Sequence, residues 1–220
     1  MKRLLKTISV LLLFPNVLFS QDDLKEFEGV IKFKHKVIAL DSTFDVNYDY
    51  SIIGKFSEFY YKNGDYKFAN HDSYFKMDLF KSNEPSNYLV MDKSDTVLVL
   101  DSKVMDVEII DYNIKESIDT IAGYPCSVLT LKLRPANSKE PISYRRYYFS
   151  KQLPINPFHF ASCKRNAYEF IYGQAKALPL RIEFDWPNRI VVWEAYEVEN
   201  QKLNDKIFEK ESNWVFVNIK

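Results

Sequence analysis

Two cysteines and a neighbouring histidine are the residues of this chain that could carry chemistry. Cys126 follows Gly-Tyr-Pro in "IAGYPCSVLTLKL", residues 121–133, and Cys163 is the other cysteine. His159 lies four residues before Cys163, one turn of a helix away. A cysteine beside a histidine can become a thiolate nucleophile or start a metal site. Catalysis would also need a group that orients the imidazole and an oxyanion hole, and zinc would need two more ligands.

The same two cysteines could instead form a disulfide. In a strand that starts at Tyr124, Cys126 points the same way as Val128, and Cys163 falls on the apolar stripe of a predicted helix. Export to an oxidising compartment favours a bond between them. Two buried free thiols and a reactive thiol are the alternatives.

Other chemical signals are weak. His35 and His71 lie far apart without ligand spacing, and His35 falls on an apolar strand face, as a hydrogen-bonded core histidine would. The chain has no G-x-S-x-G, H-E-x-x-H, P-loop or G-x-G-x-x-G motif, and its carboxylates are scattered. We therefore expect no enzyme, no cofactor and no metal.

The first twenty residues are typical of a secretory signal peptide. Lys2, Arg3 and Lys6 precede an apolar run over 8–14, and Ser20 is a small residue at the expected cleavage point. A retained N-terminal anchor is the alternative. No later segment is long and apolar enough to predict a transmembrane helix. We expect an exported protein, periplasmic above all, with secretion or association with the outer membrane as alternatives.

Charge and composition bound the mature chain. The sequence has 30 Lys and Arg against 30 Asp and Glu, so loss of the three leader cations leaves a net charge of −3. Such a balance gives no electrostatic footprint for nucleic acid. Residues 21–220 contain no linker, repeat or low-complexity tract, which favours one domain.

Hydrophobic periodicity predicts a mostly β protein. Aromatic residues make up 16% of the chain, and glycines number five. Alternating apolar residues predict half-buried strands at three sets of positions: Ile31, Phe33, His35 and Val37; Val46, Tyr48, Tyr50 and Ile52; Phe75, Met77 and Leu79. Turns at 63–64, 92–95 and 187–188 indicate antiparallel connections. About ten or eleven strands should curl into a half-barrel, with a closed lipocalin-like barrel as the alternative.

One segment predicts a helix instead. Asn156 is a suitable N-cap, Pro157 suits the first helical position, and Gly173 suits the end. Five residues between them fall on one apolar stripe: Phe160, Cys163, Ala167, Phe170 and Ile171. We expect a single helix of about four turns that covers the sheet.

The aromatic residues exceed what one compact core needs if one sheet face is solvated. A curved sheet with an apolar concave side suits an apolar ligand, although its own side chains could fill it. The candidate ligand-binding residues are Phe33, Tyr48, Tyr50, Phe75, Phe160, Phe184, Trp186 and Trp193.

Five stretches carry a family resemblance: "FEGVIKFK", "IAGYPCSVLTLKL", "YRRYYFSKQLPINP", "ALPLRIEF" and "LNDKIFEKESNWVFV". With them the chain resembles the GLPGLI-type exported Bacteroidetes envelope proteins of unknown function and, more distantly, the LolA/LolB-type lipoprotein carriers. The resemblance implies an eleven-stranded antiparallel half-barrel with a helical lid and an apolar concavity for acyl chains. This chain shows one convincing helix where the carriers have several.

Two functions follow as expectations, and a third is kept as their alternative. The first is a non-enzymatic cell-envelope protein that binds a lipid, an acyl chain or a lipidated partner in the concavity. The second is an envelope interaction or assembly module that uses a sheet edge or an aromatic patch and takes no small ligand. The third, a hydrolase, would depend on His159 and Cys163.

Overall fold

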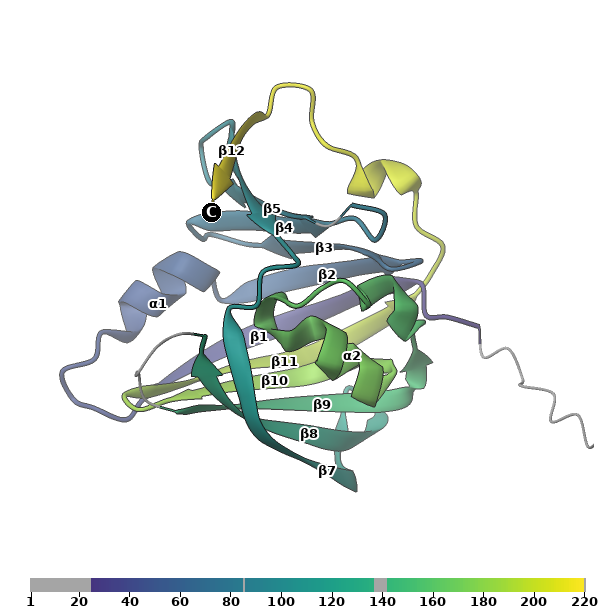
Figure 1. Ribbon diagram of the computed structural model, residues 1–220. Coiled ribbons are helices and arrows are strands. Elements are labelled where there is room, and N and C mark those ends of the chain that lie inside the picture. Colours follow the sequence, from purple (N-terminus) through teal and green to yellow (C-terminus); the bar gives the residue numbers. More distant parts are fainter. Residues whose placement is uncertain (1–24, 85, 137–141, 220) are drawn as a thin grey trace, which may run out of the picture.

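The computed structural model describes residues 25–84, 86–136 and 142–219. The predicted signal peptide, residues 1–20, lies outside the described residues. The described chain forms one twelve-stranded curved sheet with short helices over one of its faces (Figure 1).

The strands follow closely along the chain. They are β1 (Gly29–Ala39), β2 (Phe56–Lys62), β3 (Asp65–Asn70), β4 (Phe75–Phe80), β5 (Ser86–Met91), β6 (Thr96–Asp101), β7 (Val107–Ile121), β8 (Tyr124–Pro135), β9 (Ser143–Pro154), β10 (Ala177–Trp186), β11 (Arg189–Asn200) and β12 (Val215–Ile219). Their order across the sheet is β12-β6-β5-β4-β3-β2-β1-β11-β10-β9-β8-β7.

The sheet is open. All neighbouring strands pair antiparallel except β12, which runs parallel to β6. Within the described residues β7 and β12 are the two edges and do not pair with each other. The mostly β, curved sheet is therefore confirmed, whereas the closed barrel is wrong. The described residues form twelve strands, whereas about ten or eleven were expected.

Turn chemistry explains the short connections. Asn63 and Gly64 both have positive φ, 49° and 84°, so the β2–β3 hairpin has the predicted type I′ turn. Ala122 and Gly123 repeat this geometry between β7 and β8, with φ of 49° and 86°. The predicted turns at 92–95 and 187–188 join β5 to β6 and β10 to β11.

The strand predicted over 46–52 is wrong, because this segment forms the helix α1 (Val46–Ile53). The Asp45 side chain accepts a hydrogen bond from Asn47 N at 2.9 Å, and Gly54, at φ 73°, ends the helix. Alternating aromatic residues favour a strand locally, but these two caps and the packing of α1 on the sheet outweigh that preference.

The single long helix predicted over 156–173 is also wrong. The segment divides into two 3-10 helices, η1 (Pro157–Phe160) and η2 (Arg165–Ala167), followed by α2 (Tyr168–Ala175). The Asn156 cap is confirmed, since its side chain accepts from Phe158 N at 3.1 Å. Helix α2 continues past Gly173 to a left-handed Lys176.

Hydrogen bonds to the β6–β7 connection explain the interruption. The backbone N–H groups of Lys164 and Arg165 donate to Ser102 O at 2.8 and 3.0 Å. Asn166 N donates to Asp106 Oδ1 at 2.6 Å, and Asn166 has a left-handed φ of 55°. The backbone groups that a continuous helix would pair internally are satisfied by another part of the chain.

Hydrophobic side chains fill both faces of the sheet. Helices η1 and α2 cover one face, called the concave face below, which contains Phe33, Phe160 and Tyr172 among its buried residues (Figure 1). The C-terminal segment, which includes η3 (Asp205–Phe208), covers part of the opposite face. That second core comprises Val30, Met77, Leu79, Tyr88, Val90, Val97, Leu203, Phe208 and Trp214.

A register shift in β4 corrects one predicted face. Pairing with β5 is irregular between Phe75 and Met77, as at a β-bulge. Met77 and Leu79 belong to the second core, whereas Phe75 lies on the concave side with Asp78. The expectation that Phe75, Met77 and Leu79 share one face is therefore wrong.

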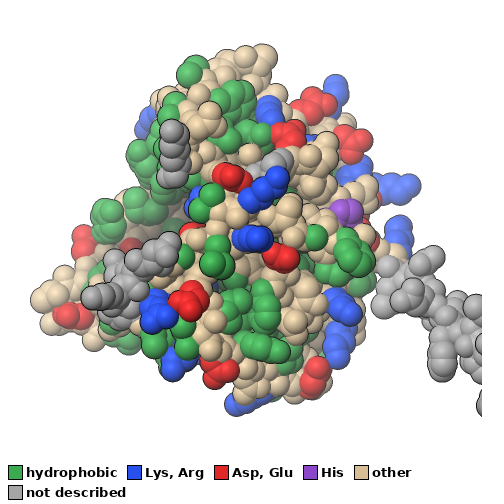
Figure 2. All heavy atoms as spheres, viewed as in Figure 1, with side chains coloured by type: hydrophobic (Ala, Val, Ile, Leu, Met, Phe, Trp, Pro, Cys, Tyr) green, Lys and Arg blue, Asp and Glu red, His purple; other side chains and the backbone are tan. Residues whose placement is uncertain are grey.

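The apolar side chains of the edge strand β12 are exposed to solvent. Val215, Phe216, Val217 and Ile219 are all between 42% and 58% exposed. Hydrophobic side chains gather around the C-terminal end in the upper part of the view in Figure 2. Charged side chains of both signs are dispersed over the rest of this face. None of the helices in the described residues has the length and apolar character to cross a bilayer.

Candidate ligand-binding site

A cavity of about 210 Å³ lies on the concave face, between the sheet and helices α1 and α2. Its lining is mostly aromatic and aliphatic, with two polar members. The lining residues are Phe33, Ile52, Ile53, Phe59, Tyr66, Phe68, Asn70, Phe75, Asp78, Leu89, Tyr147, Tyr168, Tyr172, Pro179, Ile182 and Trp193. We call this space the aromatic cavity.

A larger hollow, about 530 Å³, lies beside β7, β9 and α2. Its lining includes the charged side chains Glu26, Glu116, Lys151 and Lys176. The aromatic cavity is the better match to an apolar ligand, because burying such a ligand there displaces water from apolar rather than charged groups.

The aromatic wall is held in place by a buried histidine. The ring of His35 stacks on Trp193 with centroids 5.1 Å apart, and Trp193 stacks on Phe68 at 4.9 Å. His35 Nε2 lies 2.8 Å from Ser57 Oγ, and Nδ1 lies 3.1 Å from Gly54 O. Burial lowers the pKa of His35 to about 4. The expectation of a hydrogen-bonded core histidine is confirmed, and the neutral ring supports Trp193.

Asp78 is the single carboxylate in the lining. Its Oδ1 accepts from Asn87 Nδ2 at 3.0 Å, and its Oδ2 accepts from the Tyr66 hydroxyl at 3.4 Å. Ser102 Oγ donates to Asn87 Oδ1 at 3.0 Å and fixes that amide. Burial raises the pKa of Asp78 to about 6, an effect that Arg165 only partly offsets.

Two further lining residues carry buried polar atoms without a hydrogen-bond partner in the described residues. These atoms are Asn70 Oδ1, an acceptor, and Trp193 Nε1, a donor. Asn70 is otherwise anchored, since its Nδ2 donates to Phe75 O at 2.8 Å. Leaving such a group unpaired costs about 1–3 kcal/mol. Both residues line the aromatic cavity, but these two atoms are themselves closed off from it by surrounding groups.

The eight candidate ligand-binding residues divide into three groups. Phe33, Phe75 and Trp193 line the aromatic cavity. Phe160 is fully buried beneath it and contacts Tyr172, with ring centroids 4.1 Å apart. Phe184 meets Trp193 edge-on at 5.2 Å.

The remaining three candidates, like Phe160 and Phe184, lie outside the cavity lining. Trp186 stacks on Phe184 at 5.5 Å, away from the cavity. Tyr48 lies on α1 and is 64% exposed, so the expectation that it faces a ligand is wrong. Tyr50, also on α1, is half-buried and accepts a hydrogen bond from Val37 N at 3.1 Å. The sequence pattern predicts a strand for both tyrosines, whereas the structure has a helix there.

Sequence reasoning missed most of the lining. Alternation along the hairpin of residues 56–70 could have found Phe59, Tyr66 and Phe68, because they share one face of paired strands. No sequence signal marked Asp78, because the irregular pairing in β4 sets its side. Ile52 and Ile53 could be predicted as lining residues only if residues 46–53 were recognised as a helix.

His159 and Cys163 do not form a catalytic pair. His159 Nε2 lies 3.3 Å from Glu26 Oε2, and Glu26 also accepts from the Tyr61 hydroxyl and from Asn156 N. This cluster ties η1 to the start of the sheet. Cys163 is fully buried, and burial raises its pKa to about 12, so the thiol stays protonated. The alternative of a thiol nucleophile, suggested by the one-turn spacing, gains no support, because the helix that would align the two residues is broken.

The expected disulfide is not formed in the structure. Cys126 and Cys163 are both free and fully buried. The Cys126 thiol donates to Tyr124 O at 3.3 Å, and burial raises its pKa. Cys163 lies near Ser102 and Asp78 instead. The inward direction predicted for both cysteines is correct, but the break at residues 165–167 removes the single helical stripe that was expected to hold Cys163 over the strand of Cys126.

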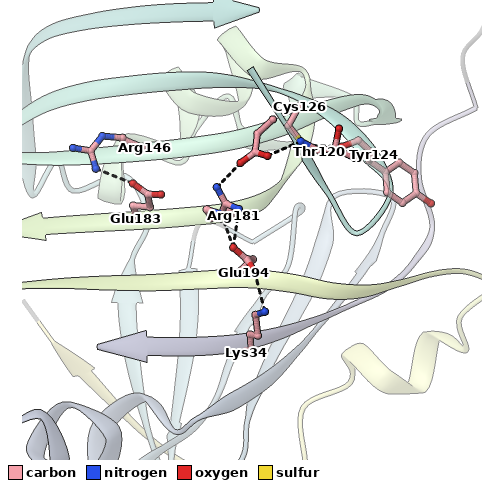
Figure 3. A network of polar contacts seen from close by, with 9 residues as sticks. Lys34, Thr120, Tyr124, Cys126, Arg146, Arg181, Glu183 and Glu194 are labelled. Atoms are coloured by element: carbon pink, nitrogen blue, oxygen red, sulfur yellow. Dashed lines mark hydrogen bonds and ion pairs between the residues drawn. The ribbon is translucent and has the colours of Figure 1, made fainter. Parts of the chain in front are cut away.

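A separate polar network crosses the opposite side of the sheet from Trp193. Arg181 lies between two carboxylates, with Nη1 2.7 Å from Asp119 Oδ2 and Nη2 2.7 Å from Glu194 Oε2 (Figure 3). Lys34 Nζ extends the chain of charges to Glu194 Oε1 at 3.0 Å. Arg181–Glu194 and Lys34–Glu194 join neighbouring strands, whereas Asp119 belongs to β7, three strands away from β10 in the sheet order. Every charge here has an opposite partner, so the network is best explained as a support that ties these strands together.

The described residues contain no group of three or more His, Cys, Asp or Glu side chains arranged to hold a metal. No protein-family model matches the sequence, and a search of curated proteins found no similar chain.

Proposed function

We propose that this protein is a non-enzymatic binding protein of the cell envelope that holds one small, largely apolar molecule in the aromatic cavity. The observation that carries the proposal is the lining itself: fourteen of its sixteen residues are aromatic, aliphatic or proline, and two are polar. Burial of apolar surface supplies the affinity, and a few polar groups set the orientation.

The volume limits the ligand. A cavity of about 150 Å³ holds one benzene ring, and the aromatic cavity measures about 210 Å³. It therefore suits one ring or one short acyl chain. A lipoprotein with several long acyl chains would need more space than this conformation offers, so we propose a single-chain or single-ring ligand.

Native mass spectrometry and calorimetric titration of the protein with 1-octanol test this proposal. We expect one molecule bound per chain and a rise in melting temperature, because a ligand that binds only the folded state stabilises it. A spectrum of the apo protein alone, with no thermal shift at saturating octanol, would contradict the proposal and leave the envelope assembly module as the alternative.

A cavity-filling variant links binding to this site. Leu89→Phe adds volume to the lining and should weaken octanol binding about tenfold. Leu40→Phe makes the same substitution at a position that is 54% exposed and should leave the affinity unchanged. Equal affinities for the two variants would place the ligand elsewhere.

A further inference from the structure

Asp78 has no ion-pair partner among the described residues, although it lines an apolar cavity. Its two oxygens are held by neutral groups, Asn87 Nδ2 and the Tyr66 hydroxyl. Arg165, whose positive charge acts on Asp78, has its Nη1 3.7 Å from Asp106 Oδ2 instead. A carboxylate buried without a cation is costly unless something neutralises it.

The rings around Asp78 are also free of protein cations. Nine aromatic side chains line the cavity. The cation–ring contacts of the described chain involve other rings: Tyr50, Tyr60, Phe184, Tyr148, Phe44, Trp186, Tyr88 and Phe216. Aromatic faces attract cations most strongly where water is excluded. The cavity thus combines unoccupied aromatic faces with an unpaired carboxylate.

The charge of Asp78 sets the sign of the ligand that fits. A cationic headgroup would complement this unpaired carboxylate. An anionic headgroup would instead meet the like charge of Asp78.

Resting on the proposed function, we infer that the ligand is a small amphiphilic amine, whose ammonium group pairs with Asp78 and whose apolar body lies against the aromatic rings. Desolvation of Asp78, which raises its pKa to about 6, is consistent with a site that lacks its cation.

Three probes of one chain length test the charge: octylamine, 1-octanol and octanoate. Near pH 7 they are a cation, a neutral molecule and an anion. We expect octylamine to bind about tenfold or more tighter than octanol, and octanoate to bind most weakly, because a desolvated charge pair adds affinity that a neutral headgroup lacks.

The outcomes separate the two proposals. Binding of octanol or octanoate as tightly as octylamine overturns the amine assignment and leaves the proposed function intact. Absence of binding by all three probes overturns both.

The variant Asp78→Asn tests whether Asp78 is the group that pairs with the ammonium group. This variant should reduce the preference for octylamine over octanol to within about threefold. Asp92→Asn is a matched change in the β5–β6 turn, where the Asp92 side chain forms an ion pair with the adjacent Lys93, and it should keep the preference. A preference that survives in Asp78→Asn would overturn the assignment.

A measurement on the unaltered protein avoids dependence on that variant. Carbon NMR of the Asp78 carboxyl should show its titration move to lower pH when octylamine is bound, since an adjacent cation favours the ionised form. No movement at saturating octylamine would overturn the pairing.

Discussion

At the residue scale, Asp78 and His35 make opposite contributions to stability between about pH 4 and 6. The pKa of His35 is lowered to about 4, so the stabilisation from its neutral ring is present above its usual pKa of 6.5 and is lost as the pH falls towards 4. The pKa of Asp78 is raised from 3.8 to about 6, so its stabilising contribution is present below 3.8 and is lost as the pH rises through 6. The two slopes, each about 1.4 kcal/mol per pH unit, nearly cancel.

Asp78→Asn should expose this cancellation. Because the amide cannot ionise, the free energy of unfolding of the variant should exceed that of the wild type increasingly as the pH rises from 3.8 to 7, by a total of about 3 kcal/mol. Urea unfolding followed by circular dichroism at both ends of the range measures the difference. Asp92→Asn serves as the control, and a difference for Asp78→Asn that does not vary with pH would contradict the prediction.

At the scale of elements, α1 is attached to the sheet by a buried ion pair and by hydrogen bonds such as that from Val37 N to the Tyr50 hydroxyl. Arg189 Nε lies 2.6 Å from Asp49 Oδ2, and Asp49 is only 7% exposed. The Arg189 guanidinium also lies over Trp186 and Phe44, 4.4 and 4.9 Å from their ring centroids. Since α1 contributes Ile52 and Ile53 to the aromatic cavity, this ion pair fixes one wall of the site.

Asp49→Asn should therefore loosen α1 without unfolding the sheet. We expect a loss of about 2 kcal/mol in the free energy of unfolding, because the buried Arg189 Nε loses the opposite charge beside it. Hydrogen exchange of the amides in residues 46–53 should accelerate, while exchange in β10 and β11 stays slow. Uniform acceleration along the chain would show that the ion pair stabilises the whole domain rather than α1.

The same scale explains what the sequence could and could not predict. Turns at 63–64 and 187–188 were predictable, because their chemistry is local. The helix over 46–53 and the interruption at 165–167 were not. Alternation over 46–52 suggested a strand, and the backbone of 164–166 is paired with Ser102 and Asp106, which lie about sixty residues away in the chain.

The candidate site shows the same limit. Phe33 and Trp193 were predicted because they lie on regular strands with clear alternation. Asp78 depends on irregular pairing in β4, and Tyr168 and Tyr172 depend on where α2 begins. Position along the chain predicts a face only while the period of two or of 3.6 residues is unbroken.

At the scale of the whole molecule, one sheet separates two hydrophobic cores with different tasks. The concave core contains the aromatic cavity and its unpaired polar atoms, whereas the core under the C-terminal segment packs Phe208 and Trp214 against Met77 and Leu79. Binding sites commonly sacrifice stability. The second core lies on the face that takes no part in the proposed binding, so its packing can stabilise the fold without affecting the cavity.

Phe208→Ala tests this division. Phe208 is 2% exposed, so its truncation should lower the free energy of unfolding by about 3–4 kcal/mol. Affinity for octylamine, measured by calorimetry on the folded fraction, should stay within about threefold of the wild type, since the sheet backbone lies between Phe208 and the cavity. Octylamine at about a hundred times its dissociation constant should raise the free energy of unfolding of both the wild type and the variant by about 2.7 kcal/mol. A large loss of affinity in Phe208→Ala would show that the two faces are coupled through the sheet, and that the C-terminal segment shapes the cavity as well as stabilising the fold.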